Sequence, residues 1–418
     1  MTLTYSERQS LLAKISALVE KKYYDPTFGG KDWKQIVAKH KDAVLRTESS
    51  GAFEAAVTDM LHDLNSSGTG ILGPATKITP RNAINASFRR IETNTDGSRW
   101  VFQDVLPGGV ADRAGVRPGD ALITAKDTDI APTETPFFPM GERIPIVISR
   151  NGDWKETHLE LATQQPKYKD NPYSEPTSVT GNIAAESLGA VKVSLFPGKI
   201  GIDFANHVDA VFREKVPSVR RLVLDMRGNP GGGIGGLHLM SYLTPSKLPI
   251  GYNIDRPTAE RGYDKASLPK LGHIPKSKLE IPFLAVKFFG KKSVVLETEG
   301  LGSQSFHGRV AILVNEHTTG AAEMLVQFAQ ENNLATVVGS KTPGRLVSRS
   351  AFKIGHNYRL VIPIGAFVSW RGNRIEGKGI TPDIPVDWSY EEALRGRDNQ
   401  MNKAIQVAQE LGGGSVFA

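Results

Sequence analysis

A glycine-rich segment after an apolar strand is the first place in this sequence where chemistry is expected. It runs Asp225-Met-Arg-Gly-Asn-Pro-Gly-Gly-Gly-Ile-Gly-Gly236, and the residues from Leu237 to Leu243 predict a helix behind it. Glycine permits positive φ and a close backbone approach, so the N–H groups of such a loop can face a developing negative charge. The simpler alternative is a turn that only lets the helix pack on the strand.

The same glycines also fit the Gly-x-Gly-x-x-Gly spacing of a dinucleotide-binding loop at residues 231–236, with Asp255 as a ribose contact. That fingerprint needs its first glycine directly after the strand, whereas residues 227–230 intervene here. Pro249 also interrupts the expected second strand. The sequence therefore disfavours dinucleotide binding, and we expect no cofactor.

A second candidate is the turn in Leu313-Val-Asn-Glu-His-Thr-Thr-Gly-Ala-Ala-Glu-Met324, where an apolar strand is expected to pass directly into a helix. A helix N-terminus carries partial positive charge and free N–H groups, which stabilise an alkoxide or an oxyanion. The spacing predicts an N-cap at position 320 with Glu323 three residues later. His317 is expected to be a turn or packing residue. A nucleophile would be well placed here, but residue 320 is glycine.

Taken together, these segments resemble those of the C-terminal processing (tail-specific, tricorn-type) serine peptidases. Residues 224–232 are similar to the family's glycine loop, and residues 315–323 to the segment that carries its nucleophilic serine. Asp63-Leu-Asn-Ser-Ser-Gly-Thr-Gly70 resembles a Ser-His-Thr-Gly segment of the histidine-using branch. Ile375-Glu-Gly-Lys-Gly-Ile-Thr-Pro-Asp383 resembles a signature near the C-terminal end. The resemblance covers most of the chain from about residue 65 to residue 383.

The resemblance implies a role for each matching position. The backbone amides of Gly231, Gly232 and Ala321 would form an oxyanion hole. Glu376 would be the acidic residue that orients a base, with Ser67 in its hydrogen-bond network. For Glu376 alone, the alternative is a solvated loop carboxylate.

Two positions depart from the family pattern, and both are glycine. Gly320 stands where the nucleophilic serine is expected, and Gly68 stands where the general-base histidine is expected. The neighbouring Ser67 and Thr69 match the pattern, so a shifted alignment does not explain the difference. The other branch of the family uses a lysine base, but Arg345 occupies that position and arginine keeps its proton. We therefore expect hydrolysis to be lost or crippled.

The elements that must position these residues predict a multidomain α+β fold. Apolar residues at helix spacing predict three helices near the N-terminus, and short alternating strands follow them. Arg221–Leu224 and Val310–Val314 are strands each followed by a turn and a helix, which is typical of β-α units on one sheet. The resemblance implies a crotonase-like (ClpP-type) core. The expected boundaries are 1–80 for a helical module, 81–164 for a PDZ domain, 165–185 for a linker, 186–390 for the peptidase core and 391–418 for a C-terminal helix.

The PDZ expectation depends on Val105-Leu-Pro-Gly-Gly-Val-Ala-Asp-Arg-Ala-Gly-Val-Arg-Pro-Gly-Asp-Ala-Leu-Ile123, which resembles the PDZ signature of bacterial proteases. The segment predicts a strand end, a short helix that stops at Gly115, and a Pro118-Gly119 turn into a strand. PDZ folds bind peptide C-termini by strand addition and a carboxylate-binding loop. The alternative is a β-rich spacer that binds nothing. By position, the carboxylate loop would consist of Ala83, Ile84, Asn85 and Ala86.

Composition excludes several classes of function. The 418 residues are too many for one core, and 39% hydrophobic with 23% charged residues is typical of a globular protein. Lys and Arg number 51 against 44 Asp and Glu, a net charge of +7 without a basic cluster, so nucleic acid is not implied. No cysteine is present, which excludes thiolate catalysis and Cys-type zinc sites, and we expect no metal. No apolar run has the length of a signal peptide or a membrane span. The chain is expected in the cytoplasm as written, or in the periplasm or outside the cell if a signal peptide was removed.

The sequence thus predicts a serine-peptidase-type protein that recognises polypeptide C-termini through a PDZ domain and has lost catalysis. The alternative from another class is a binding or scaffold protein that evolved as such. The expected partner is a polypeptide substrate or C-terminal peptide, and a homo-oligomer is compatible with the resemblance. The simplest test is the double change Gly320→Ser with Gly68→His, which should create hydrolysis.

Overall fold

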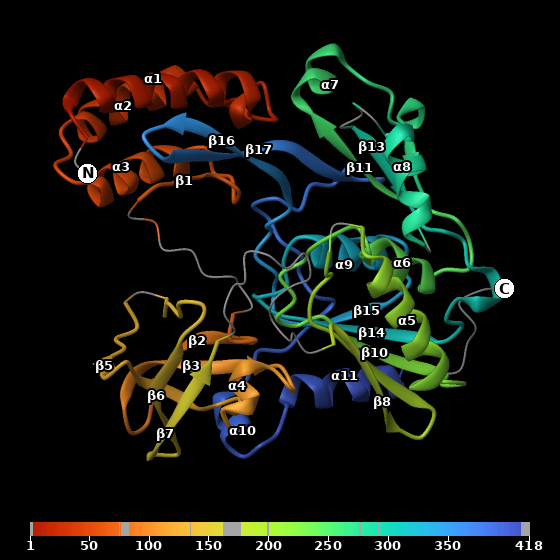
Figure 1. Ribbon diagram of the computed structural model, residues 1–418. Coiled ribbons are helices and arrows are strands. Elements are labelled where there is room, and N and C mark those ends of the chain that lie inside the picture. Colours follow the sequence, from red (N-terminus) through yellow and green to blue (C-terminus); the bar gives the residue numbers. More distant parts are fainter. Residues whose placement is uncertain are drawn as a thin grey trace.

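A computed structural model arranges the chain as three bodies, each built on one sheet (Figure 1). The structure describes residues 3–74, 76, 83–133, 135–161, 177–198, 200–275, 277–288, 290 and 293–410. In these segments no helix is both long enough and apolar enough to span a bilayer. The mixed α/β multidomain architecture predicted from the sequence is confirmed.

The N-terminal body contains the three predicted helices and strands from much later in the chain. Each helix begins at a capping side chain. The helices are α1 (Tyr5–Lys22) after Thr4, α2 (Trp33–Leu45) after Asp32 and α3 (Ser50–His62) after Ser49. They share one core with β1 (Gly70–Leu72), β16 (Val347–Gly355) and β17 (Tyr358–Ser369), where Leu360 and Ile362 are fully buried. The three predicted helices are confirmed, but the expected range 1–80 does not enclose their whole core, because strands from much later in the chain complete it.

The sheet of this body continues through β17, which is long enough to pair with strands on both sides. Its strand order is β1, β17, β11 (Pro249–Asp255), β13 (Val294–Glu297) and β12 (Lys270–Leu271), with β16 also paired to β17. The helices α7 (Arg256–Arg261) and α8 (Ile281–Lys287) lie in the connections between its strands.

The second body, called the β-module here, comprises the described residues from 83 to 161. It has its own core and a five-strand path with β2 at one edge. The predicted short helix is confirmed as α4 (Val110–Arg113), and Gly115 behind it has φ +78°. The strands are β2 (Ala86–Thr93), β3 (Gly97–Val105), β4 (Ala121–Ala125), β5 (Thr128–Asp129), β6 (Arg143–Arg150) and β7 (Asp153–Glu160).

The central body is a sheet with helices on both faces. Its order is β18 (Ile384–Pro385), β15 (Thr336–Gly339), β14 (Arg309–Val314), β10 (Arg221–Asp225), β9 (Leu188–Val193) and β8 (Val179–Ala185), and only the β8–β9 pair is antiparallel. Successive side chains of a strand point to opposite faces. Leu222 and Leu224 accordingly pack toward α5 (Ile202–Glu214), α6 (Gly236–Tyr242) and α9 (Ala321–Glu331), whereas Val223 packs toward α11 (Asn399–Glu410). Figure 1 shows these two helical layers.

Two expected boundaries are corrected by this body. Residues 179–185 were expected in a linker but form β8, because their backbone pairs with β9 and Val179 is buried in the core. The rest of the expected linker, 165–176, lies outside the described residues. The C-terminal segment holds two helices rather than one, α10 (Tyr390–Leu394) and α11, separated at Gly396 with φ +71°.

Candidate functional site

The glycine loop and the start of α9 meet because β10 and β14 are parallel neighbours, with Asp225 opposite Leu313. The carboxyl ends of parallel strands meet at the same edge of a sheet. Gly231 has φ +83°, and a β-carbon there would lie 2.8 Å from both the Ala321 nitrogen and the Thr319 oxygen. Only glycine therefore allows the two predicted segments to lie this close together.

Position 320 lies at the N-terminus of α9 with φ +65° and ψ −128°. A β-carbon there would come no nearer than 3.4 Å to another atom, the Pro230 oxygen. The space of a serine side chain is thus open at its base, although this backbone conformation is one that residues with side chains rarely adopt. The predicted cap is present in part, since the Gly320 N–H donates to Glu323 at 3.1 Å.

The three predicted oxyanion amides differ in availability. The Gly231 N–H already donates to the Oδ1 atom of Asn229 at 2.8 Å, so in this conformation it is not free for an oxyanion. The Gly231 carbonyl and the Gly233 amide form backbone hydrogen bonds with Phe196. The Gly232 amide takes no part in these two bonds. The Ala321 amide belongs to the first turn of α9, where N–H groups have no partner within the helix. Gly232 and Ala321 remain the candidate donors.

Glu323 is fully buried and fixes the start of α9 to the segment 342–345. Besides the Gly320 amide it accepts hydrogen bonds from the Thr342 hydroxyl at 2.6 Å, the Gly344 amide at 2.7 Å and the Arg345 amide at 2.8 Å. Four donors saturate the carboxylate, so the role of Glu323 extends beyond the helix cap expected for it.

Glu376 is not a solvated loop carboxylate. It accepts hydrogen bonds from the Ser67 amide at 2.6 Å and the Ser67 hydroxyl at 3.1 Å, as the predicted pairing of these residues requires. It also accepts from the Ser66 hydroxyl at 3.3 Å and from the Leu346 amide at 2.8 Å. The segment 344–346 therefore bridges the group around position 320 and the group around Glu376.

The space expected for a base side chain at position 68 is occupied. A β-carbon at Gly68 would lie 2.7 Å from the Cγ2 atom of Val347 and 3.3 Å from the Cγ atom of Pro363. Both neighbours belong to the hairpin of β16 and β17, which pairs with β1 directly after Gly68. A histidine at this position requires Val347 to move, and nothing in the motif around residue 68 signals this.

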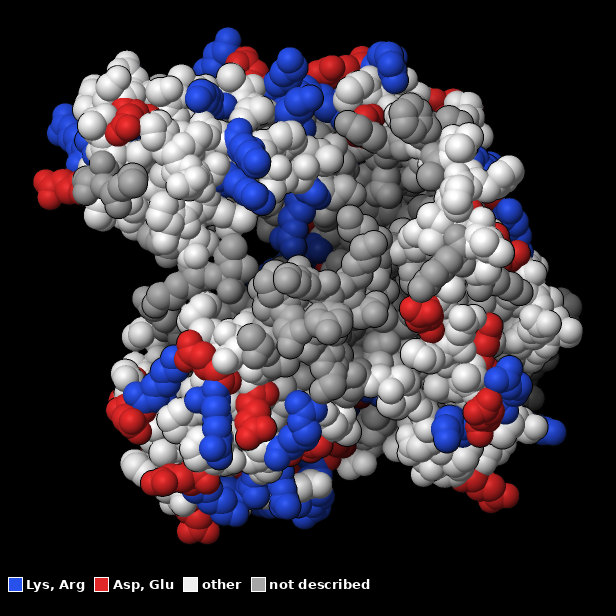
Figure 2. All heavy atoms as spheres, in the orientation of Figure 1, with Lys and Arg blue, Asp and Glu red and all other residues white. Residues whose placement is uncertain are grey.

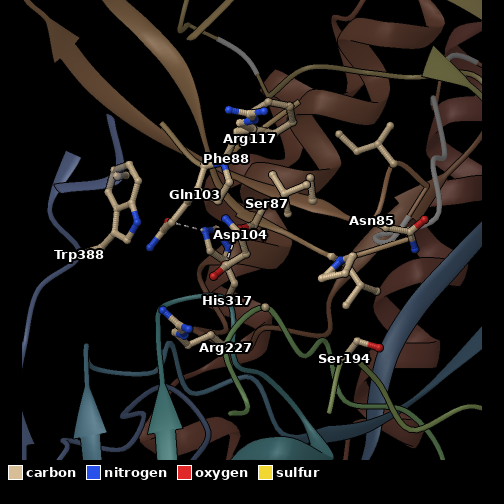
Figure 3. Close-up of a pocket in the computed structure, with 18 of the residues that line it drawn as sticks. Asn85, Ser87, Phe88, Gln103, Asp104, Arg117, Ser194, Arg227, His317 and Trp388 are labelled. Carbon is tan, nitrogen blue, oxygen red and sulfur yellow. Dashed lines mark hydrogen bonds between the residues drawn. The ribbon is translucent and has the colours of Figure 1, made fainter. Parts of the chain in front are cut away.

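A cavity of about 1280 Å³ lies between the β-module and the central body (Figure 3). Its lining includes the expected carboxylate loop, residues 83–86, and three neighbours of position 320: Pro230, Thr319 and Arg345. Within the loop, Asn85 has φ +53° and its side chain accepts from the Val110 amide at 3.2 Å. The structure thus joins the predicted peptide loop and the predicted nucleophile turn in one groove.

Three consecutive residues after β14 hold the β-module against the central body. Asn315 donates to Asp104 at 2.8 Å, and Glu316 lies 3.5 Å from Arg89. The ring of His317 is 3.2 Å from the Gln103 side chain, as Figure 3 shows, which makes it a packing residue as expected. Asn315 lies in the predicted nucleophile turn, residues 313–324. Its bond to Asp104 in the β-module explains why a side-chain amide is needed at this position.

The Asp-Met-Arg part of the glycine motif has a structural role that its sequence did not reveal. Burial by itself would raise the pKa of Asp225, but Arg227 and Lys192 hold it far below its ordinary value. Arg227 is buried too and also binds Asp398 at 2.7 Å, directly before α11. The glycine loop and the C-terminal helix are therefore joined through one ion-paired arginine.

Comparisons with known proteins agree with this arrangement. Residues 187–386 match the model of peptidase family S41. The carboxyl-terminal-processing protease of Synechocystis sp. is 22% identical, over 100% of this chain and 90% of that protein. The chloroplastic carboxyl-terminal-processing peptidase 2 of Arabidopsis thaliana is 24% identical, over 97% of this chain and 75% of that protein. The solved photosystem II D1 C-terminal processing protease superposes with a TM-score of 0.53 at 18% identity, over 93% of this chain and 96% of that one, which shows a shared fold. The chain carries a peptidase family S41 domain and is similar, across its length, to carboxyl-terminal processing serine proteases.

Proposed function

We propose that this chain binds the C-terminal segment of a polypeptide in the groove between the β-module and the S41 domain, and that it does not hydrolyse it. The observation that carries the proposal is the single cavity that joins residues 83–86 to the surroundings of Gly320. A bound peptide would extend from residues 83–86 to the surroundings of Gly320.

The β-module supports recognition of a free C-terminus by strand addition. In the described part of the sheet, β2 ends the strand order, so its outer edge is available to an added strand. The loop 83–86 leads into this edge, and two of its carbonyl groups are already hydrogen-bonded within the protein: Ile84 accepts from Ala111 and Asn85 accepts from Leu106, each at 2.9 Å. With these two acceptors occupied, the loop amides are the groups proposed to bind a carboxylate, as in a PDZ fold.

The absence of a nucleophile and a base supports the loss of hydrolysis. Glycine at 320 has no hydroxyl, and the site of a base at 68 is filled by Val347. The nearby Thr318 hydroxyl is buried and donates to the Met226 carbonyl at 2.9 Å, so it is no substitute. A serine-type mechanism needs both missing groups.

A calorimetric titration with two peptides tests the proposal. They share one sequence with an apolar C-terminus, and differ only in a free carboxylate against an amide. We expect amidation to weaken binding by about tenfold or more, since hydrogen bonds to a charged group contribute about 1.5–3 kcal/mol. Equal affinities of the free and the amidated peptide would contradict the proposed role of residues 83–86 as a carboxylate-binding loop.

Two alanine-to-aspartate variants, one inside the groove and one outside it, test the proposed location of the bound C-terminus. Ala83→Asp should weaken the free peptide because two carboxylates repel each other there. Ala184→Asp makes the same change on an exposed residue of β8 outside the groove lining and should leave the affinity unchanged. Equal effects of both variants would contradict the proposed location.

A further inference from the structure

The groove between the two bodies has an uneven balance of free charge. Each acidic side chain described in its lining already has a polar partner within the protein. The pairs are Asp104 with Ser87 and Asn315, Asp120 with Arg150, Asp225 with Arg227 and Lys192, Glu316 with Arg89, and Asp398 with Arg227. Four of these five carboxylates are therefore paired with a cation before any ligand arrives, whereas Asp104 is held by two neutral groups.

The basic side chains of the lining are compensated only in part. Four of them pair with carboxylates, namely Arg150, Lys192, Arg227 and Arg397, the last with Glu392 at 3.6 Å. Two others, Arg117 and Arg345, are exposed and have no carboxylate partner in the described portion of the chain. In the described lining, the groove thus presents two guanidinium groups without a carboxylate partner, against one carboxylate, Asp104, without a cationic partner.

These two arginines come from the two walls of the groove, and their backbones are fixed. The Arg345 amide is held by buried Glu323, and the Arg345 carbonyl would lie 3.9 Å from a β-carbon at Gly320. The Arg117 amide donates to Asp120 at 2.8 Å, between α4 and β4. Figure 3 shows Arg117 among the residues that the β-module contributes to the lining. A ligand lying in the groove has one cation on each side.

We propose that the groove selects polypeptide segments that carry acidic side chains, with Arg117 and Arg345 as the residues that determine this specificity. The inference rests on the proposed function and adds a substrate class to it. A guanidinium binds a carboxylate through two parallel hydrogen bonds, which favours Glu or Asp over Gln. Lys and Arg side chains also gather over β16 and β17, along the border of the hollow on the face seen in Figure 2, and attract acidic segments from a distance.

Three peptides of one length, each with a free apolar C-terminus, test the proposal by fluorescence anisotropy with the full chain. Two internal positions are Glu in the first, Gln in the second and Lys in the third. We expect the affinity to decrease in the order Glu, Gln, Lys. The Glu peptide should bind about three- to tenfold more tightly than the Gln peptide, within the range for partly exposed ion pairs. Added salt should weaken the Glu peptide most.

Variants of the two arginines assign the effect. Arg117→Gln and Arg345→Gln should each reduce the Glu-to-Gln preference, and together they should bring it close to one. Arg371→Gln, at an exposed position outside the groove lining, is the control and should leave the preference unchanged. A preference that survives the double change overturns the assignment.

The result also separates this inference from the proposed function. If the Gln peptide binds and loses affinity on amidation while the Glu peptide binds no better, the peptide groove stands and the acidic specificity is refuted. If no peptide binds, both are refuted.

Discussion

Glu323 and Glu376 accept hydrogen bonds from adjacent backbone amides, those of Arg345 and Leu346, each at 2.8 Å. Glu323 belongs to the first turn of α9, beside Gly320. Glu376 binds Ser67, beside Gly68. Two carboxylates thus hold one short segment, and this segment connects the two positions where catalytic side chains are missing.

Glu323→Gln should lower the free energy of unfolding by about 1–3 kcal/mol, the cost of leaving a buried donor or acceptor unsatisfied. An amide nitrogen in place of one carboxylate oxygen would face either the Gly320 and Arg345 amides or the Thr342 hydroxyl and Gly344 amide. Urea unfolding followed by tryptophan fluorescence measures the change. Glu410→Gln at the exposed end of α11 is the control, and a Glu323→Gln value within 0.5 kcal/mol of it, the usual range for surface changes, would contradict the argument.

The double change Gly320→Ser with Gly68→His should not be enough to create hydrolysis, contrary to what the sequence suggests. The histidine would collide with Val347, whose Cγ2 atom lies 2.7 Å from the required β-carbon. The serine would add strain of about 1–3 kcal/mol at φ +65°. Adding Val347→Ala opens the space, so the triple variant should cleave a fluorogenic peptide while the double variant and the unmodified chain do not.

The control for this experiment is the same variant with Gly320→Ala in place of Gly320→Ser. It keeps the strain and the opened space but lacks the hydroxyl, and it should be inactive. Turnover by the unmodified chain, or a folded and peptide-binding triple variant without turnover, would show that the assigned roles of positions 68 and 320 are wrong.

Gly231→Ala should destabilise the protein more than Gly372→Ala by about 1–3 kcal/mol, the usual cost of overpacking. Both glycines have positive φ, +83° and +91°, so the conformational strain of the new side chain is similar. At Gly231 the β-carbon would also press against backbone atoms of Thr319 and Ala321, whereas at Gly372 nothing lies within 4 Å. Equal losses in urea unfolding would mean that the glycine loop and α9 are not held together as described.

His238 should make stability depend on pH. Its two ring nitrogens lie 2.6 Å from Glu299 and 2.7 Å from Asp209, so both donate only when the ring is charged. Burial opposes that charge, but the hydrogen bonds to the two carboxylates outweigh it and raise the pKa of His238. A raised folded-state pKa gives stability that is fully present below the unfolded value of about 6.5 and is lost as the pH rises through the folded value.

The measurement compares His238→Gln with the unmodified chain at pH 6 and pH 9. The loss of stability should be larger at pH 6. Tyr242 and His273 contact the same two carboxylates, Asp209 and Glu299, so the comparison is repeated in a His273→Gln background, which removes the second histidine of the cluster. Asn206→Gln, at an exposed position of α5 that carries no titratable group, should cost the same at both values, and a pH-independent loss for His238→Gln would exclude the charged state.

The sequence by itself determined the local elements and most of the candidate site. Apolar spacing predicted α1, α2, α3, β10 and β14, and the motifs identified the glycine loop, the turn at Gly320 and the pairing of Ser67 with Glu376. These features depend on residues close together in the chain or on a resemblance that covers it. The PDZ role of residues 83–86 stays a prediction, since strand addition and carboxylate binding concern a ligand that the chain does not contain.

Only the tertiary structure decided the rest. Val347 fills the space beside Gly68, Asn229 takes the amide of Gly231, and strands β16 and β17 complete the core of the N-terminal helices. Most of these facts join residues far apart in the chain, and the Asn229 bond depends on a rotamer that packing selects. Periodicity reports which face of an element is buried but not which distant side chain covers it, because that choice is made by the packing of all the elements together.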